Sequence, residues 1–184
     1  MLAYSSIAHT GYVLLGLLGT LSHPEQISSV WMYIVGYSVM TSGLFILISQ
    51  SEPKADTGVE LIDLTGMIKR NPFNTILWTI FFFSMAGIPF TVGFFTKYFV
   101  FMSAISAGEV FYVVIAALCA VVSAYAYLRP VGLMVMRDAD PSAAEWKGSM
   151  VSRSMVIISA ILVIALGVMP NALIQILKGI PLQN

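Results

Sequence analysis

Residues 71–108 read NPFNTILWTIFFFSMAGIPFTVGFFTKYFVFMSAISAG, and the only charged side chain in this stretch is that of Lys97. The apolar run is interrupted once, at Gly87-Ile88-Pro89, eight residues before the lysine. Placing an ammonium in lipid costs at least about 2.5 to 3.5 kcal/mol on insertion scales, so an ionisable group inside a membrane usually marks a function. The stretch therefore predicts a membrane helix that is broken near its middle and carries a functional cation.

The composition of the whole chain is that of an integral membrane protein. Hydrophobic residues make up 58% of the 184 residues, charged residues make up 10%, and the mean hydropathy is +0.88. Soluble domains carry about 25% charged residues. The formal net charge is zero, which gives no indication of a nucleic-acid partner. The single cysteine, Cys119, lies in an apolar run, so we interpret it as an apolar filler and expect no disulfide or metal cluster.

Five segments are apolar over the length of about 20 residues that a bilayer requires. We expect them at about residues 2–21, 27–49, 72–106, 110–136 and 154–177. The third would be about 50 Å long as one straight helix, against a hydrocarbon core of about 30 Å. Gly87 and Pro89 interrupt its hydrogen-bond ladder, so we predict two half-helices joined by an irregular turn that ends at Thr91. The predicted fold is thus an all-α membrane protein with about five spans.

Basic residues gather in two of the predicted connections. These are Lys54, Lys69 and Arg70 between the second and third spans, and Arg129, Arg137, Lys147 and Arg153 between the fourth and fifth. The other two connections carry only His23, Glu25 and Glu109 as titratable groups. By the positive-inside rule, the two basic loops and the N-terminus face the cytoplasm, and the tail from Lys178 onward lies outside.

A short amphipathic helix is predicted in the first basic loop. Thr57-Gly58-Val59-Glu60 matches a capping box, and Leu61, Leu64 and Met67 then recur on one helical face. Such a helix lies on the membrane surface. It is either a cover over a cytoplasmic opening or a plain surface connector, and both interpretations stay open.

Lys97 is the first candidate for a proton path. Burial disfavours its charged form, so this side chain can take up and release a proton as its surroundings change. Broken helices in transporters expose backbone dipoles and leave room for water beside such a group. The break at Gly87 and Pro89 is therefore part of the candidate site, and Thr91, at its end, is a candidate polar lining residue.

His9 is the second candidate. It shares a helical stripe with Ser5, Tyr12 and Gly16, at spacings of four, three and four residues. Histidine titrates near physiological pH and can relay protons, with Ser5 and Tyr12 as polar lining. Small and polar residues on one face also mark a helix–helix contact. The stripe alone does not decide between these two roles.

Further polar groups are interpreted as structural. Ser29, Tyr33, Gly36, Met40 and Gly43 form a mostly small face on the second span, which favours packing. Tyr125, Tyr127 and Arg129 follow the pattern of interfacial anchors. No motif for a nucleotide, a haem or an iron–sulfur cluster is found, so we expect no redox chemistry in this chain.

Two motifs resemble the antiporter-like subunits of respiratory complex I. LAYSSIAHTGY at residues 2–12 is similar to a signature helix of that family, and AGIPFTVGFFTKY at residues 86–98 is similar to its broken, lysine-bearing helix. AYLR at residues 126–129 and GVMP at residues 167–170 also fit the family pattern. The Tyr98–Phe99 pair after the lysine is most similar to the type called subunit N of NADH-quinone oxidoreductase, or subunit 2 in mitochondria.

The resemblance implies a role in proton translocation. It implies a fold of inverted five-helix repeats, with Lys97 as the terminal lysine of a polar axis through the membrane and His9 as a member of that axis. The implied complex passes electrons from NADH to a quinone through FMN and iron–sulfur clusters on other subunits, and this chain would be a non-redox part of the translocase. The implied partners are other membrane-arm subunits and the lipid bilayer, in a bacterial inner membrane.

The resemblance covers only the last spans of such a subunit. We therefore expect either a fragment of a longer protein or one piece of a subunit encoded in pieces, which needs the missing N-terminal part as a partner. Two alternatives stay open. One is a cation/proton antiporter or membrane-bound hydrogenase subunit, which shares these helices. The other is a fragment without transport activity.

Overall fold

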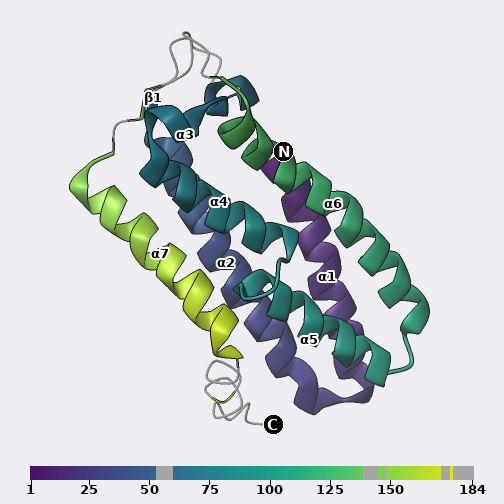
Figure 1. The fold of residues 1–184 in the computed structure, drawn as a ribbon. Coiled ribbons are helices and arrows are strands. Elements are labelled where there is room, and N and C mark those ends of the chain that lie inside the picture. The colour runs from purple at the N-terminus through teal and green to yellow at the C-terminus, as the bar shows by residue number, and fades with distance from the viewer. Residues whose placement is uncertain (53–59, 139–144, 147, 171–174, 176–184) are drawn as a thin grey trace.

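The computed structural model describes residues 1–52, 60–138, 145–146, 148–170 and 175, and within these ranges the chain is a bundle of long helices (Figure 1). The helices are α1 Leu2–Ser22, α2 Ile27–Ser49, α3 Met67–Arg70, α4 Pro72–Ala86, α5 Val92–Ser106, α6 Val110–Met136 and α7 Met150–Val168, with 3-10 turns η1 Pro24–Gln26 and η2 Leu61–Leu64. α1, α2, α6 and α7 are long and apolar enough to cross a membrane, whereas α4 and α5 are shorter apolar helices. The prediction of an all-α membrane protein is confirmed.

The third span is broken as predicted. α4 and α5 have 15 residues each, and Figure 1 shows them as consecutive half-helices joined by a short turn. Gly87 ends α4 in the left-handed region at φ 87°, which glycine adopts without steric cost. The amides of Gly87 and Ile88 both bond to the carbonyl of Phe83, at 3.1 and 3.0 Å. The turn therefore caps the first half-helix from its own backbone.

Ser84 fastens the second half-helix to the first. Its hydroxyl accepts a hydrogen bond of 3.1 Å from the amide of Gly93, near the start of α5, and donates to the sulfur of Met40 on α2. A Cβ atom at Gly93 would collide with the carbonyl oxygen of Ser84. The glycine is thus required by the close approach of the two backbones.

α1 and α5 run side by side in the same direction. A Cβ at Gly16 would lie 3.0 Å from Val30 and 3.3 Å from Val100, and one at Gly19 would lie 2.8 Å from the backbone of Ser103. Small residues at such positions let membrane helices approach closely. Together with α2, which packs against both helices, this pair forms the frame that holds the candidate site.

The apolar core and the lipid-facing surface are separate. The larger buried cluster joins α2, α4, α6 and α7 around Leu44, Phe81, Phe82 and Met134. A smaller cluster around Tyr12 joins α1, α2, α5 and α6. Large apolar side chains are exposed along α6 and α7, including Leu118, Val121, Val122, Ile158 and Ile161. An apolar surface of this extent suits lipid or neighbouring helices rather than water.

The short helix expected in the first basic loop is two pieces rather than one. Gly66, at φ 59°, separates η2 from α3, so the face of Leu64 and Met67 is not continuous. Both side chains are buried, and the amide of Gly66 donates to the carbonyl of Leu133 on α6 at 3.1 Å. The described part of the loop around Leu64, Gly66 and Met67 is therefore folded onto the bundle.

The capping box in this loop lies one turn later than predicted. Thr57 is outside the described residues, and the observed box pairs Glu60 with Asp63 at the start of η2. The amide of Glu60 donates to the Asp63 carboxylate at 2.8 Å. Asp63 can form this bond because it stands three residues after Glu60, where an acidic side chain reaches back to the amide that precedes the helix.

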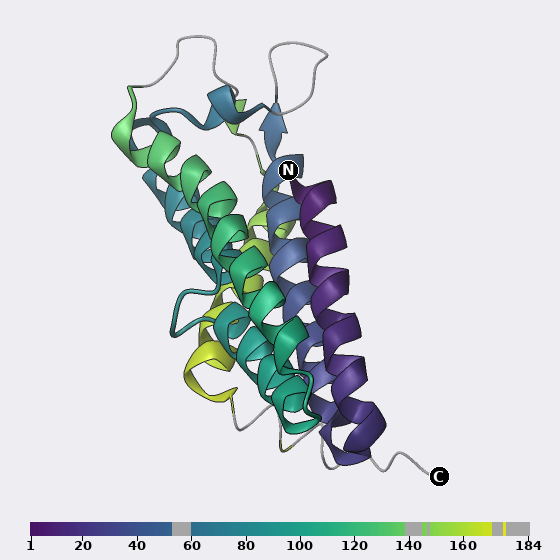
Figure 2. The same ribbon diagram turned by 90° about the vertical axis from the view of Figure 1, so that its right-hand side faces the viewer.

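The two basic loops meet at one end of the bundle. β1 (Ser51–Glu52) pairs antiparallel with β2 (Glu145–Trp146), a contact that the sequence pattern does not indicate. Trp146 then packs edge-on against Trp78, with ring centroids 5.7 Å apart. The N-terminus lies at this same end (Figures 1 and 2).

α7 begins earlier than expected. The prediction placed its start at Ser154, but Ser149 caps the helix by accepting a hydrogen bond from the amide of Ser152, so the first helical residue is Met150. In the described residues the helix ends at Val168. The predicted end at 177 and the tail from Lys178 lie outside the described residues.

Candidate functional site

Lys97 is buried against the break in the third span. The residue is only 8% exposed, and its Nζ donates a hydrogen bond of 2.8 Å to the carbonyl oxygen of Met85. In a continuous helix this oxygen would accept from the amide of residue 89, but Pro89 has no amide hydrogen. The lysine therefore takes an acceptor that the proline leaves free. A Cβ at Gly87 would lie 3.2 Å from Nζ, so a side chain there would press on the lysine.

Tyr12 lies between Lys97 and the histidine of α1. Its ring centroid is 5.8 Å from Nζ of Lys97, within the range of a cation–π contact. The same ring meets the ring of His9 edge-on at 5.9 Å. The phenol donates a long hydrogen bond of 3.4 Å to the carbonyl of Ala116 on α6. Tyr12 thus contacts both titratable candidates.

His9 is enclosed by tyrosines from two other helices. Nδ1 is 2.7 Å from the hydroxyl of Tyr33 on α2, and Nε2 is 3.4 Å from the hydroxyl of Tyr127 on α6. The ring stacks on Tyr37 at 4.4 Å. A neutral imidazole offers one donor and one acceptor, and tyrosine hydroxyls can complement both. The residue is therefore hydrogen-bonded on both sides of its ring.

Ser5 extends this chain toward the N-terminal end of α1. Its hydroxyl is hydrogen-bonded to the hydroxyl of Tyr127 at 2.5 Å. Ser5, Tyr127, His9 and Tyr33 thus form one continuous set of buried hydrogen bonds. Each of these groups can donate and accept, which a proton relay requires.

The structure brings together four of the five predicted polar residues. Ser5, His9, Tyr12 and Lys97 line one chain of contacts, whereas Thr91 does not join it. The hydroxyl of Thr91 donates to the carbonyl of Ile88 in the turn, and its backbone packs against Gly167 of α7. We therefore assign Thr91 to the structure of the break.

Tyr127 and Tyr33 are members of the site that the sequence analysis assigned elsewhere. The anchor interpretation was wrong for Tyr127, which is 3% exposed, although the neighbouring Tyr125 is 73% exposed. The sequence did contain a signal that Tyr127 is not an interfacial anchor. Tyr127 precedes the predicted end of its span by nine residues, about 14 Å of helix, which is too deep for an interfacial ring. Tyr33 packs as expected on its small-residue face, but it also bonds His9.

Two cavities adjoin the ends of this polar chain. One of about 260 Å³ is lined by Tyr4, Ser5, Ser123 and Tyr127 near the N-terminal end of α1. The other, of about 280 Å³, is lined by Gly87, Phe94, Lys97, Ala120 and Ala124 at the helix break. Both are large enough for several water molecules. The two ends of the polar chain, at Ser5 and at Lys97, thus each adjoin a cavity.

No candidate metal centre is found in the part of the chain that the structure describes, since no three His, Cys, Asp or Glu residues are grouped there. The polar chain consists of hydroxyl, imidazole and ammonium groups. Its chemistry is therefore that of hydrogen bonding and proton exchange.

Comparison with known families gives a match over residues 1–123, which include α1, α2, α4, α5 and the first half of α6. The matching family is described as NADH:quinone oxidoreductase/Mrp antiporter, TM (Proton_antipo_M). The match covers two-thirds of the chain and contains Ser5, His9, Tyr12 and Lys97.

Individual relatives extend the similarity to nearly all of the chain. NADH-quinone oxidoreductase subunit N 1 of Herpetosiphon aurantiacus is 37% identical over 183 residues, which are 99% of this chain and 37% of the relative. Subunit N of Cupriavidus taiwanensis is 38% identical over 182 residues, 96% of this chain and 37% of the relative. The chain thus spans little more than a third of the length of these relatives.

A solved structure shares the fold. A chain of respiratory complex I from Thermus thermophilus with bound Aureothin superposes with a TM-score of 0.77 and 30% identity. The superposition covers 95% of this chain and 38% of that chain.

Proposed function

Because the chain belongs to the NADH:quinone oxidoreductase/Mrp antiporter transmembrane family, we propose that it is part of a membrane subunit that translocates protons. The similarity to subunit N relatives favours a complex that passes electrons from NADH to a quinone. In that complex the redox groups, including FMN and iron–sulfur clusters, belong to other subunits. This chain contributes a non-redox part of the membrane arm and requires the rest of its own subunit.

The observation that carries the proposal is the position of Lys97. The Met85 carbonyl oxygen stabilises the buried ammonium only while it stays in place, and loss of the proton weakens the hydrogen bond across the helix break because the donor is no longer charged. Protonation of the lysine is therefore linked to the geometry of the break. A change imposed on the turn by other subunits would alter how strongly the site holds a proton, which is the coupling that a pump requires.

We propose that protons move along the polar chain from Ser5 toward Lys97. Water in the cavity beside Ser5 delivers a proton to the hydroxyl of Ser5, which is hydrogen-bonded to the hydroxyl of Tyr127. The hydroxyl of Tyr127 is in turn hydrogen-bonded to His9. Tyr12 separates His9 from Lys97 by ring contacts only, so the last transfer requires a water molecule or a side-chain rearrangement. Because no hydrogen bond joins His9 to Lys97, this is the step at which the rate of proton transfer can be controlled.

The same proposal sets the orientation of the chain. β1 and β2 tie together two connections that carry Lys69, Arg70 and Arg137, and Arg153 lies in the first turn of α7 that follows β2. The N-terminus lies at the same end. Basic connections remain in the cytoplasm. We therefore place this end in the cytoplasm and the turn between α5 and α6 outside, in a bacterial inner membrane.

The family description also includes the Mrp antiporters, so the test must separate two driving forces. Source membranes are solubilised gently, separated on a native gel, stained for NADH oxidation and probed for this chain. Membrane vesicles are then assayed for proton movement driven by NADH and by a sodium gradient. Presence in the NADH-active complex with NADH-driven movement supports the proposal. Presence outside that complex, with sodium-driven proton exchange, would show that the chain belongs to an antiporter.

A further inference from the structure

Lys97 adjoins an apolar cavity between the helix break and α6. The cavity has a volume of about 280 Å³, and its walls include Phe94 and Tyr98 of α5 and Ala120 and Ala124 of α6. Lys97 is the only charged residue among the described residues that line it. The cavity thus combines apolar walls with one ammonium.

The ammonium of Lys97 has more donors than the described residues satisfy. It carries three N–H groups, and one of them has an acceptor there, the carbonyl oxygen of Met85. The sequence has no acidic residue between Asp63 and Glu109. A buried charge without an opposite charge is costly. The site therefore favours an anion as a further partner of the lysine.

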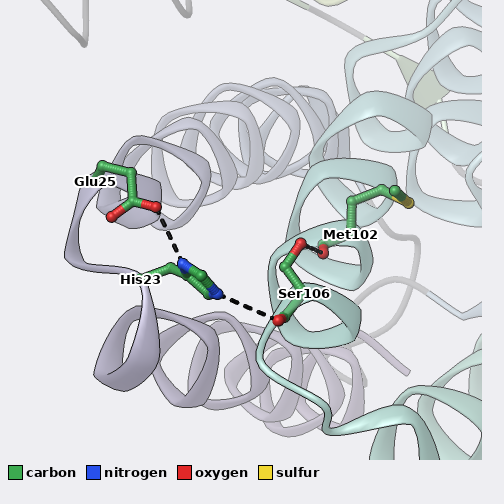
Figure 3. A network of polar contacts seen from close by, with 4 residues as sticks. All are labelled: His23, Glu25, Met102 and Ser106. Carbon is green, nitrogen blue, oxygen red and sulfur yellow. Dashed lines mark hydrogen bonds and ion pairs between the residues drawn. The ribbon is translucent and has the colours of Figure 1, made fainter.

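No ion pair with Lys97 is found among the residues that the structure describes. The ion pairs there are those of His23 with Glu25 and of Lys69 with Asp138. His23 and Glu25 lie at the turn between α1 and α2, where Nε2 of the histidine is 3.2 Å from the carbonyl oxygen of Ser106 at the end of α5 (Figure 3). An anion at Lys97 therefore comes from outside the described part of the chain.

The depth of Lys97 in the membrane restricts the kind of anion. Nine residues of α5, about 14 Å of helix, separate Lys97 from Ser106 at the end of that helix. The hydrocarbon core of a bilayer is about 30 Å thick, so the lysine lies near its middle, whereas phospholipid head groups lie outside the core. A single carboxyl group on an apolar chain reaches this depth with little polar surface.

The size and the opening of the cavity favour a single hydrocarbon chain. An α-helix with its side chains is about 10–12 Å across, which is too wide for a space of this volume. From Phe94 to Phe101 the cavity extends over seven residues of α5, about 10 Å. Tyr98 and Val121, which line it, are also exposed on the surface of the bundle. An extended chain can thus enter between α5 and α6 from the side.

We propose that this cavity binds a long-chain fatty acid from the bilayer, with its carboxylate paired to the ammonium of Lys97 and its chain between α5 and α6. The acid enters uncharged and gives its proton to the neutral lysine amine: the O–H bond breaks and an N–H bond forms. No net charge is carried through the hydrocarbon. The carboxylate oxygens then accept the N–H groups that Met85 leaves unpaired.

The binding site stands independently of the proposed function, but its consequence for transport rests on that function. A lysine held in an ion pair with a carboxylate releases its proton less readily than a lysine without one. Occupancy of the cavity should therefore slow proton translocation through Lys97.

The first test maps the bound chain. The full complex, in phosphatidylcholine vesicles, is exposed to a palmitic acid analogue with a photoreactive diazirine in its chain, and the labelled peptides are identified by mass spectrometry. We expect label on α5 between Phe94 and Phe101 and on α6 near Ala120. Excess palmitate should remove this label, whereas hexadecanol, which has the same chain without a carboxyl group, should not. Absence of label from both segments would show that protein fills the cavity and would overturn the proposal.

Two variants separate the charge from the cavity. Lys97→Met keeps an unbranched apolar side chain and removes the ammonium, so the analogue concentration for half-maximal labelling should rise about tenfold or more. Ala120→Leu fills the cavity and keeps the lysine, and it should also reduce labelling. Val122→Leu is the control, because Val122 is exposed on the same helix and does not line the cavity.

These comparisons can contradict the proposal in two ways. Equal labelling of the wild type and Lys97→Met, or equal competition by palmitate and hexadecanol, would show that the carboxylate is not recognised. Undiminished labelling of Ala120→Leu would show that the chain does not lie in this cavity. If Lys97→Met does not assemble, the hexadecanol competition and Ala120→Leu still decide the question.

The proposed function and the binding site fail in distinguishable ways. If the complex does not translocate protons, the proposed function is wrong, while the labelling still decides whether a fatty acid binds. In a complex that does translocate protons, palmitate should slow NADH-driven movement more in the wild type than in Ala120→Leu. Leakage of protons carried by the acid through the lipid is common to both. Equal slowing would contradict the consequence for transport.

Discussion

The ammonium of Lys97 donates to the carbonyl oxygen of Met85 at 2.8 Å, across the break between α4 and α5. This pairing joins the two half-helices at the point where Pro89 removes the usual amide donor. The same residue that breaks the helix thus creates the acceptor that holds the lysine. Lysine and proline are therefore parts of one local arrangement, although eight residues separate them in the sequence.

Gly87→Ala should disturb this arrangement. The left-handed backbone at φ 87° costs a residue with a Cβ roughly 1–2 kcal/mol, and the new methyl would lie 3.2 Å from Nζ of Lys97. We expect lower thermal stability of the purified subunit and slower proton translocation. Gly132→Ala in α6 is the control, because its Cβ would have open space. Equal melting temperatures of the two variants would contradict the account of the break.

Tyr33→Phe should remove one of the hydrogen bonds that hold the ring of His9 in place. The variant removes the hydroxyl that lies 2.7 Å from Nδ1 and keeps the ring, so we expect a loss of about 0.5–1.5 kcal/mol in stability and a lower rate of proton transfer. Tyr125→Phe is the matched control, since Tyr125 is 73% exposed. The comparison uses the translocation rate of the assembled complex. Unchanged transport in Tyr33→Phe would remove Tyr33 from the relay.

Gly43→Ala should destabilise the bundle without touching the polar chain. A Cβ at Gly43 would collide with the ring of Phe81, which is fully buried. Overpacking of this kind costs roughly 1–3 kcal/mol. Thermal unfolding should therefore occur at a lower temperature than in the control Gly11→Ala, whose Cβ meets nothing within 4 Å. A melting temperature equal to that of the control would show that α2 and α4 can separate freely.

Much of the fold could be predicted from local signals. The lengths of the apolar segments predicted the long helices, and Gly87 with Pro89 predicted the break between α4 and α5. Each of these signals acts on the backbone of its own segment. The motifs at residues 2–12 and 86–98 lie within the region matched by the family, so the resemblance found in the sequence is confirmed. Ser149 could have been recognised as the cap of α7, since it is a capping residue directly before an apolar run.

The candidate site could be predicted only in part. Ser5, His9 and Tyr12 share one face of one helix, so their spacing revealed them. Tyr33 and Tyr127 come from helices whose rotation about their own axes is set by packing, and no local pattern fixes which face meets His9. The pairing of β1 with β2 likewise depends on where two distant loops end in space.

The central claim is that Lys97 carries a proton during translocation. The most direct test is the number of protons moved per electron in vesicles that contain the full complex with Lys97→Ala. Lys69→Ala is the control, because Lys69 is an exposed lysine paired with Asp138 in the loop region. We predict that Lys97→Ala abolishes or sharply reduces the proton-to-electron ratio, whereas Lys69→Ala keeps it. An unchanged ratio in an assembled Lys97→Ala complex would contradict the claim.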